Sequence, residues 1–239
     1  MKTVLEFFVV FSIAILPQIL GSIFSMKDPE HLRKFSPVQR TASNLGRWSG
    51  IILLLIYIAL DHPPGLWFIG LRFPSSGLPL ALLVSGFTTV YLSLVFVLPR
   101  FRSRQFQEQT ESVRRSIFAA GAFDTYHGLW GKLSYLFTLW LGVVAEDLVF
   151  RGYLVLGLGA LTGSYFPWIV LSIFFSVASH LYQGLDRRIM LGQVIFAAIF
   201  TTVSLITGSV ITAIIPHLVY DTIWLLRGWA KDSKPVPPA

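Results

Sequence analysis

Six ionisable side chains lie inside strongly apolar segments of the C-terminal half of this 239-residue chain. Placing a charge in an apolar membrane helix is costly, so such groups are candidates for function. Carboxylates and histidines are also the groups that perform general acid–base chemistry or hold a metal ion. The six are Glu146, Asp147, Arg151, His180, His217 and Asp221.

Their spacing predicts which of them meet along one helix. Asp147 and Arg151 are four residues apart, so they share a helix face, and we expect them to neutralise each other. Glu146 is rotated by about 100° from Asp147 and has no obvious local partner. His217 and Asp221 are again four apart and share a face.

The remaining ionisable residues of interest are given simpler interpretations. Glu6 lies near a helix end, where we expect it to face lipid headgroups. His31, His62 and His127 fall in predicted loops, and we interpret them as solvent or interface residues.

The elements that position these groups are predicted to be transmembrane helices. Only 13% of the residues are charged and 54% are hydrophobic, whereas a soluble domain carries about 25% charged residues. Seven segments are apolar enough for a helix of about 20 residues to cross a bilayer. They are 3–24, 49–71 (interrupted near Asp61), 78–98, 133–161, 165–181, 190–206 and 210–226. We therefore predict an all-α, polytopic integral membrane protein with about seven (six to eight) transmembrane helices.

The basic residues gather in alternate loops, at 26–48, at 100–115, after His180 and in the tail. The positive-inside rule then places the C-terminus in the cytoplasm and explains the net charge of +7 without a nucleic-acid partner. The first apolar segment also resembles a signal peptide, but it lacks an A-x-A-like cleavage site, which favours a retained helix. We predict an interfacial segment between Arg115 and Lys132.

For the ionisable groups to meet, the helix that carries Glu146 must continue through 152–161. Gly163 is a plausible stop, and Gly152, Gly157 and Gly159 would let neighbouring helices approach closely. On that register His217 lies near the membrane midplane, while Glu146, His180 and Asp221 lie in the cytoplasmic half. The four groups could then line one cavity open to the cytoplasm.

Three motifs resemble those of the CAAX prenyl protease and bacteriocin-processing family, the CPBP (ABI) intramembrane proteases. They are EDLVFRG at 146–152, SVASHL at 176–181 and HLVYD at 217–221, and the resemblance extends over about 139–226. Three residues depart from the usual pattern: Asp147 replaces Glu, Ser176 replaces Phe, and Asp221 replaces the commoner Asn. We expect the change at Ser176 to affect packing around His180 more than chemistry.

The apolar segments and basic loops predict transmembrane helices and an interfacial segment at 1–130 and a short cytoplasmic tail at 229–239. The resemblance implies a CPBP-like helical core at 131–228. It also implies that Glu146 and His180 activate a water, while His217 and Asp221 orient the substrate or stabilise the oxyanion. Ionised Asp221 has no proton to donate, so we expect it to orient His217 or to be protonated. Asp147 and Arg151 support the site.

A zinc site of Glu146, His180 and His217 is the alternative that the same residues allow. The metal-free mechanism is favoured because Glu146 serves better as a base than as a ligand. The chain contains no cysteine and no H-E-x-x-H sequence, which excludes a cysteine nucleophile and the usual zincin motif.

The function expected from the resemblance is an intramembrane endopeptidase in a bacterial inner or plasma membrane. Its partners would be membrane lipids and a protein or peptide substrate, prenylated or not. The alternatives are a non-catalytic immunity or scaffold protein on the same fold and an ion- or proton-coupled transporter.

Overall fold

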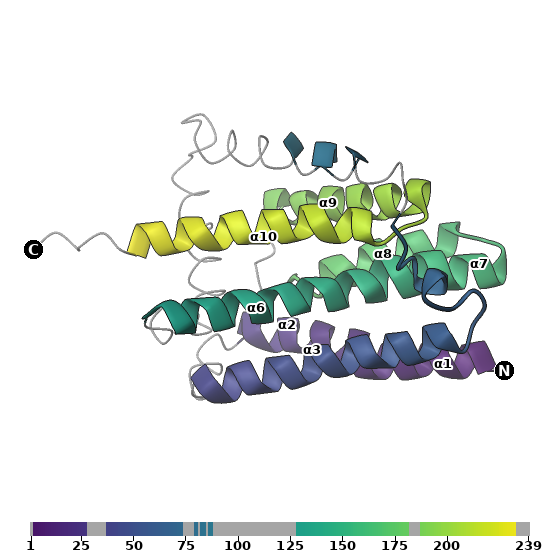
Figure 1. Ribbon diagram of the computed structural model, residues 1–239, viewed down its shortest axis with the longest axis horizontal. Coiled ribbons are helices and arrows are strands. Elements are labelled where there is room, and N and C mark those ends of the chain that lie inside the picture. The colour runs from purple at the N-terminus through teal and green to yellow at the C-terminus, as the bar shows by residue number, and fades with distance from the viewer. Residues whose placement is uncertain are drawn as a thin grey trace, which may run out of the picture.

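The computed structural model describes residues 2–27, 37–73, 128–181 and 187–232, with short pieces at 79–80, 82–84 and 86–87. Within these residues the chain is helical and contains no strand, which confirms the all-α prediction. The helices lie roughly side by side along the long axis (Figure 1). They are α1 (Lys2–Val10), η1 (Phe11–Ile15), α2 (Leu16–Lys27), α3 (Pro37–Leu60), η3 (Gly65–Ile69), α6 (Gly128–Asp147), η5 (Leu148–Leu158), α7 (Gly159–Thr162), α8 (Phe166–Ala178), α9 (Arg187–Thr207) and α10 (Ile211–Asp232).

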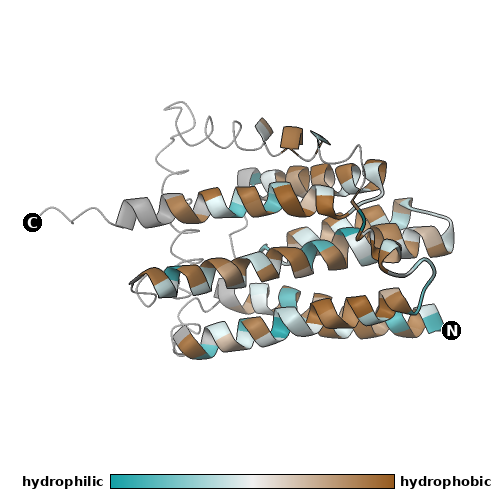
Figure 2. Ribbon diagram, in the orientation of Figure 1, coloured by the Kyte–Doolittle hydropathy of each residue, from teal (hydrophilic) through white to brown (hydrophobic). Residues whose placement is uncertain are grey.

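Four helical stretches in the described residues are long and apolar enough to cross a membrane: Lys2–Phe24, Thr41–Leu60, Leu129–Thr162 and Met190–Thr207. Two further apolar stretches, Phe166–Ala178 and Ile211–Ile223, are shorter. Hydrophobic residues cover most of the length of these helices (Figure 2). Most of the predicted segment 78–98, and nearly all of the predicted interfacial segment, lie outside the described residues, as do His31 and His127. The long apolar helices identify an integral membrane protein.

The helix of the second predicted segment, 49–71, begins and ends earlier in the chain than predicted. Its helix α3 starts at Pro37 and stops at Leu60. His62-Pro63-Pro64 follows, and the two prolines supply no amide hydrogen to continue a helix. The chain then makes the short 3₁₀-helix η3 at the end of the bundle.

The long helix required by the site is present. It runs from Leu129 to Thr162 without a break, and Gly163 ends it with a left-handed backbone at φ +67°, as expected. Its stretch Leu148–Leu158, η5, is a π-helix, which the sequence did not indicate. A π-helix joins residues five apart by hydrogen bonds, so residues i and i+5 come onto one face.

The glycines of this helix allow close approach, although the neighbour is η3 for two of them. A Cβ on Gly152 would lie 2.7 Å from the carbonyl oxygen of Ile69, and one on Gly157 would lie 2.8 Å from the Phe68 ring. Gly159 packs against the Tyr165 ring. η3 is therefore pressed onto the helix that carries the ionisable groups.

Glu6 was expected to face lipid headgroups and His62 to face solvent or an interface, but the two side chains contact each other. Their side chains are only 13% and 10% exposed, and His62 Nε2 lies 2.8 Å from Glu6 Oε2. The His62 ring also stacks on Phe68, with centroids 4.6 Å apart. Glu6 therefore pairs with a residue 56 positions away instead of facing headgroups, and His62 joins α1 to η3.

Candidate active site

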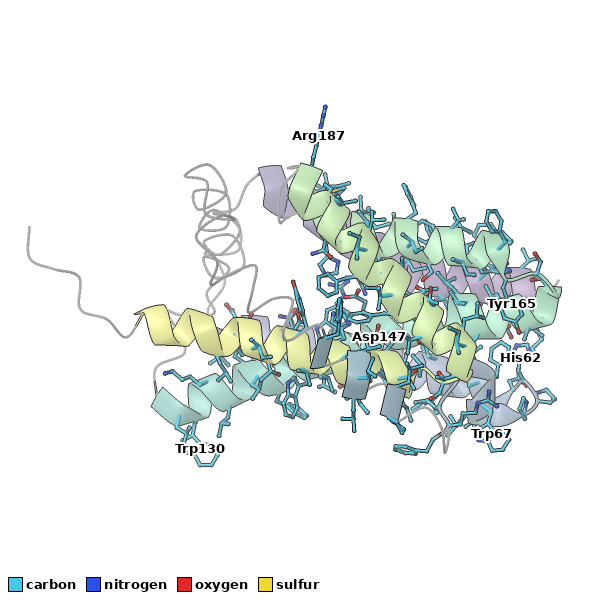
Figure 3. All side chains as sticks on the ribbon, turned by 90° about the horizontal axis from the view of Figure 1, so that it is seen from above. His62, Trp67, Trp130, Asp147, Tyr165 and Arg187 are labelled. Atoms are coloured by element: carbon cyan, nitrogen blue, oxygen red, sulfur yellow. The ribbon has the colours of Figure 1, made fainter. Side chains whose placement is uncertain are left out.

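All six predicted ionisable residues converge inside the bundle, from three separate parts of the chain. Glu146 and Asp147 end α6, and Arg151 lies in η5. His180 follows the last turn of α8, and His217 and Asp221 lie on α10. Figure 3 places Asp147 partway along the bundle, between Trp130 at one end and His62 and Tyr165 at the other.

Arg151 is the central charge of the cluster. Its side chain is 2% exposed, and its Nη1 lies 3.0 Å from Asp147 Oδ1, which confirms the predicted pair. This contact is an ion pair whose angles fall outside those of a hydrogen bond. The guanidinium also lies 5.8 Å from the Phe150 ring centroid and 5.9 Å from that of Phe200. Burying this charge is tolerable because carboxylates and aromatic rings surround it.

Glu146 does have a local partner, contrary to the sequence-based expectation. Arg151 Nη1 donates to Glu146 Oε1 at 3.4 Å. In a regular α-helix two residues five apart diverge by about 140°. The π-helical turns that begin at Leu148 reduce this divergence, so one guanidinium reaches both acids.

His180 faces the other oxygen of Glu146. Its Nε2 lies 3.8 Å from Glu146 Oε2, which is too long for a direct hydrogen bond. On the far side of the ring, Nδ1 lies 2.8 Å from the backbone oxygen of Ser176. A carbonyl oxygen can only accept, so Nδ1 donates this hydrogen bond, and in the tautomer with one ring proton the lone pair is on Nε2. A ring nitrogen and a carboxylate oxygen thus oppose each other at a separation of 3.8 Å.

His217 is held by a different acid from the one expected. Its Nδ1 lies 3.1 Å from Asp147 Oδ2, and Asp147 is fully buried. Its Nε2 lies 3.9 Å from Asp221 Oδ2, beyond hydrogen-bond distance. Asp147 is therefore the acid within hydrogen-bond distance of the His217 ring, in addition to pairing with Arg151. Asp221 keeps a longer ion-pair contact with the same ring, at 3.9 Å.

Ser176 is the residue of this cluster that the sequence-based interpretation underrated. Its hydroxyl accepts from Arg151 Nη2 and donates to Glu146 Oε1, both at 3.3 Å. The departure from Phe at this motif position was the available signal, because a small polar residue replaces a large apolar one next to buried charges.

Exposure divides the cluster into a buried ion pair and an accessible rim. Asp147 and Arg151 are 0% and 2% exposed, whereas Glu146, His180 and Asp221 are 13%, 18% and 24% exposed. A reactant can therefore reach the rim but not the Asp147–Arg151 pair. The buried pair orients the groups above it.

The donor geometry bears on the zinc alternative. In the part of the chain that the structure describes, no three His, Cys, Asp or Glu side chains are arranged to hold a metal ion. Two of the three residues of the zinc alternative, Glu146 and His180, oppose each other through Oε2 and Nε2 at 3.8 Å. Glu146, His180 and His217, the residues of the zinc alternative, are therefore not grouped as metal ligands in this arrangement.

A known protein family matches the region of the chain that contains this cluster. Residues 128–223 match the family described as type II CAAX prenyl endopeptidase, Rce1-like. All six ionisable residues and Ser176 fall inside the matched region, and the resemblance inferred from the three motifs is confirmed. No curated protein and no solved structure matches the chain.

Proposed function

From the match of residues 128–223 to the type II CAAX prenyl endopeptidase family, we propose that this chain is an intramembrane endopeptidase whose water is activated by Glu146 and His180. The family match supports a CAAX-type intramembrane protease in general terms, with a protein substrate in a membrane environment. The single observation that carries the proposed residues is the opposition of Glu146 Oε2 and His180 Nε2 across 3.8 Å at the accessible rim.

The proposed reaction adds one water across a peptide bond. Water bound at this gap donates one hydrogen bond to His180 Nε2 and loses its other proton to Glu146 as its oxygen bonds the carbonyl carbon. The carbonyl electron pair moves onto oxygen. When the C–N bond breaks, Glu146 returns the proton to the leaving amine, which leaves a carboxylic acid and an amine.

His217 is proposed to stabilise the oxyanion. When both ring nitrogens are protonated, Nδ1 donates to Asp147 and Nε2 remains to donate to the developing negative charge. Asp147 thereby acts on the ring in the way the acid of a catalytic triad orients its histidine. Asp221, at 3.9 Å from Nε2 and 24% exposed, is placed to contact the substrate beside this donor.

The substrate proposed is a membrane-associated protein, with a prenylated C-terminal peptide as the first probe. The purified chain would be reconstituted in liposomes with a farnesylated fluorogenic peptide, and an unfarnesylated peptide of the same sequence would test the lipid requirement. We expect Glu146→Gln and His180→Ala each to reduce kcat at least ~100-fold, the scale of a lost general base.

Asp61→Asn is the matched control, because Asp61 is an exposed acid paired with Lys2. It precedes His62 in the sequence, and Figure 3 shows His62 toward the end of the bundle, away from Asp147. The Asp61→Asn variant should leave cleavage unchanged. Cleavage of both peptides at the wild-type rate by both active-site variants would refute the proposal and would favour the non-catalytic or transporter alternatives.

A further inference from the structure

Ser176 makes an unusual set of contacts for a serine in a membrane helix. Its side chain is 5% exposed, and its hydroxyl lies between Arg151 Nη2 and Glu146 Oε1 at 3.3 Å from each. Its backbone oxygen accepts from His180 Nδ1 at 2.8 Å and from Ser179 Oγ at 2.8 Å. One residue therefore contacts both members of the Glu146–His180 pair.

The Ser176 hydroxyl limits the number of hydrogen bonds between the Arg151 guanidinium and the Glu146 carboxylate. Arg151 presents two terminal nitrogens, and an arginine fork facing a carboxylate normally forms two parallel hydrogen bonds to its two oxygens. Here Nη1 contacts Glu146 Oε1, but Nη2 is occupied by Ser176. The second carboxylate oxygen, Oε2, is left facing His180.

We infer that Ser176 is a positioning residue that prevents Glu146 from forming a bidentate pair with Arg151 and so keeps Oε2 directed at the water beside His180. This inference rests on the proposed function of Glu146. Without the hydroxyl, Arg151 Nη2 loses its acceptor and draws Oε2 toward itself. The base then turns away from the water while the fold and the substrate contacts remain.

The test is steady-state cleavage of the farnesylated peptide by the reconstituted full chain. We expect Ser176→Ala to lower kcat by about 10-fold or more, as for an interaction made in the transition state, with KM within about 2-fold of wild type. Ser176→Thr keeps a hydroxyl and should restore kcat to within about 3-fold of wild type. Ser176→Cys keeps the side-chain shape but donates weakly, so it should behave like alanine.

Ser172→Ala is the matched control. Ser172 lies one turn earlier on α8, is 1% exposed, and its hydroxyl has no hydrogen-bond partner among the described residues. It should keep wild-type kcat. If Ser176→Ala does not fold, the comparison of cysteine with threonine carries the test.

The inference is overturned if Ser176→Ala or Ser176→Cys keeps wild-type kcat, if the loss lies in KM alone, or if threonine fails to restore activity. Glu146→Gln, measured in parallel, separates this failure from that of the proposed function. An inactive Glu146→Gln with a fully active Ser176→Ala removes only the role of Ser176, whereas an active Glu146→Gln removes the function itself.

Discussion

Replacing Arg151 by Met should strongly destabilise the protein, because it leaves Asp147 buried without its cation. Arg151 is 2% exposed and Asp147 is 0% exposed, with Nη1 and Oδ1 3.0 Å apart. Removing one member of a buried ion pair costs about 3–5 kcal/mol. Methionine fills much of the volume, so the loss comes mainly from the stranded charge and not from a cavity.

The matched variant is Asp147→Asn, whose amide oxygen can still accept from His217 Nδ1. It leaves Arg151 with Glu146 as its ion partner at 3.4 Å, so the loss should be smaller, about 1–3 kcal/mol. In the double variant neither Arg151 nor Asp147 carries a charge. The loss of stability in the double variant should therefore be smaller than the sum of the two single losses by about 1–3 kcal/mol.

The assay is thermal unfolding of the detergent-purified chain, followed by tryptophan fluorescence. For a chain of this size a loss of about 3–5 kcal/mol lowers Tm by roughly 6–20 °C. A decrease of less than about 2 °C for Arg151→Met, or strict additivity in the double variant, would refute the electrostatic account of the buried pair.

Two further predictions concern packing and metal dependence. Gly157→Ala should lower the free energy of unfolding by about 1–3 kcal/mol, because its Cβ would lie 2.8 Å from the Phe68 ring. Gly50→Ala in α3, which has open space around its Cβ, should raise the free energy of unfolding by about 0.5–1 kcal/mol. Equal effects of the two variants on Tm would contradict the close approach of η3. Chelators should leave cleavage of the farnesylated peptide unchanged, and loss of activity that added Zn²⁺ restores would contradict the proposed metal-free mechanism.

The residues proposed to perform the chemistry are recognisable from the amino-acid sequence. A chain that avoids charge in its apolar segments but places acids, histidines and an arginine there indicates helices with buried function. The four-residue spacing of Asp147 and Arg151 predicts their pair, because i and i+4 share a helix face whatever surrounds them. Gly163 also marks the helix end correctly, since a left-handed residue there favours glycine.

Contacts between distant helices are beyond such reasoning. Asp147 meets His217 across 70 positions, and Glu6 meets His62 across 56. Local periodicity specifies which face of its own helix a residue occupies, but not how far that helix is rotated or shifted against another. Only packing decides that rotation, so the sequence indicated Asp221 as a partner of His217 but not the closer Asp147.

What the sequence by itself determined is the helical class, the membrane environment and the identity of the ionisable groups, because these follow from composition and from spacing within one helix. Only the tertiary structure decided how Glu146 is held. The π-helical turns of η5 bring Arg151 to it, and α8 packs Ser176 between them. Both depend on how side chains pack between helices, and that packing is a property of the assembled bundle.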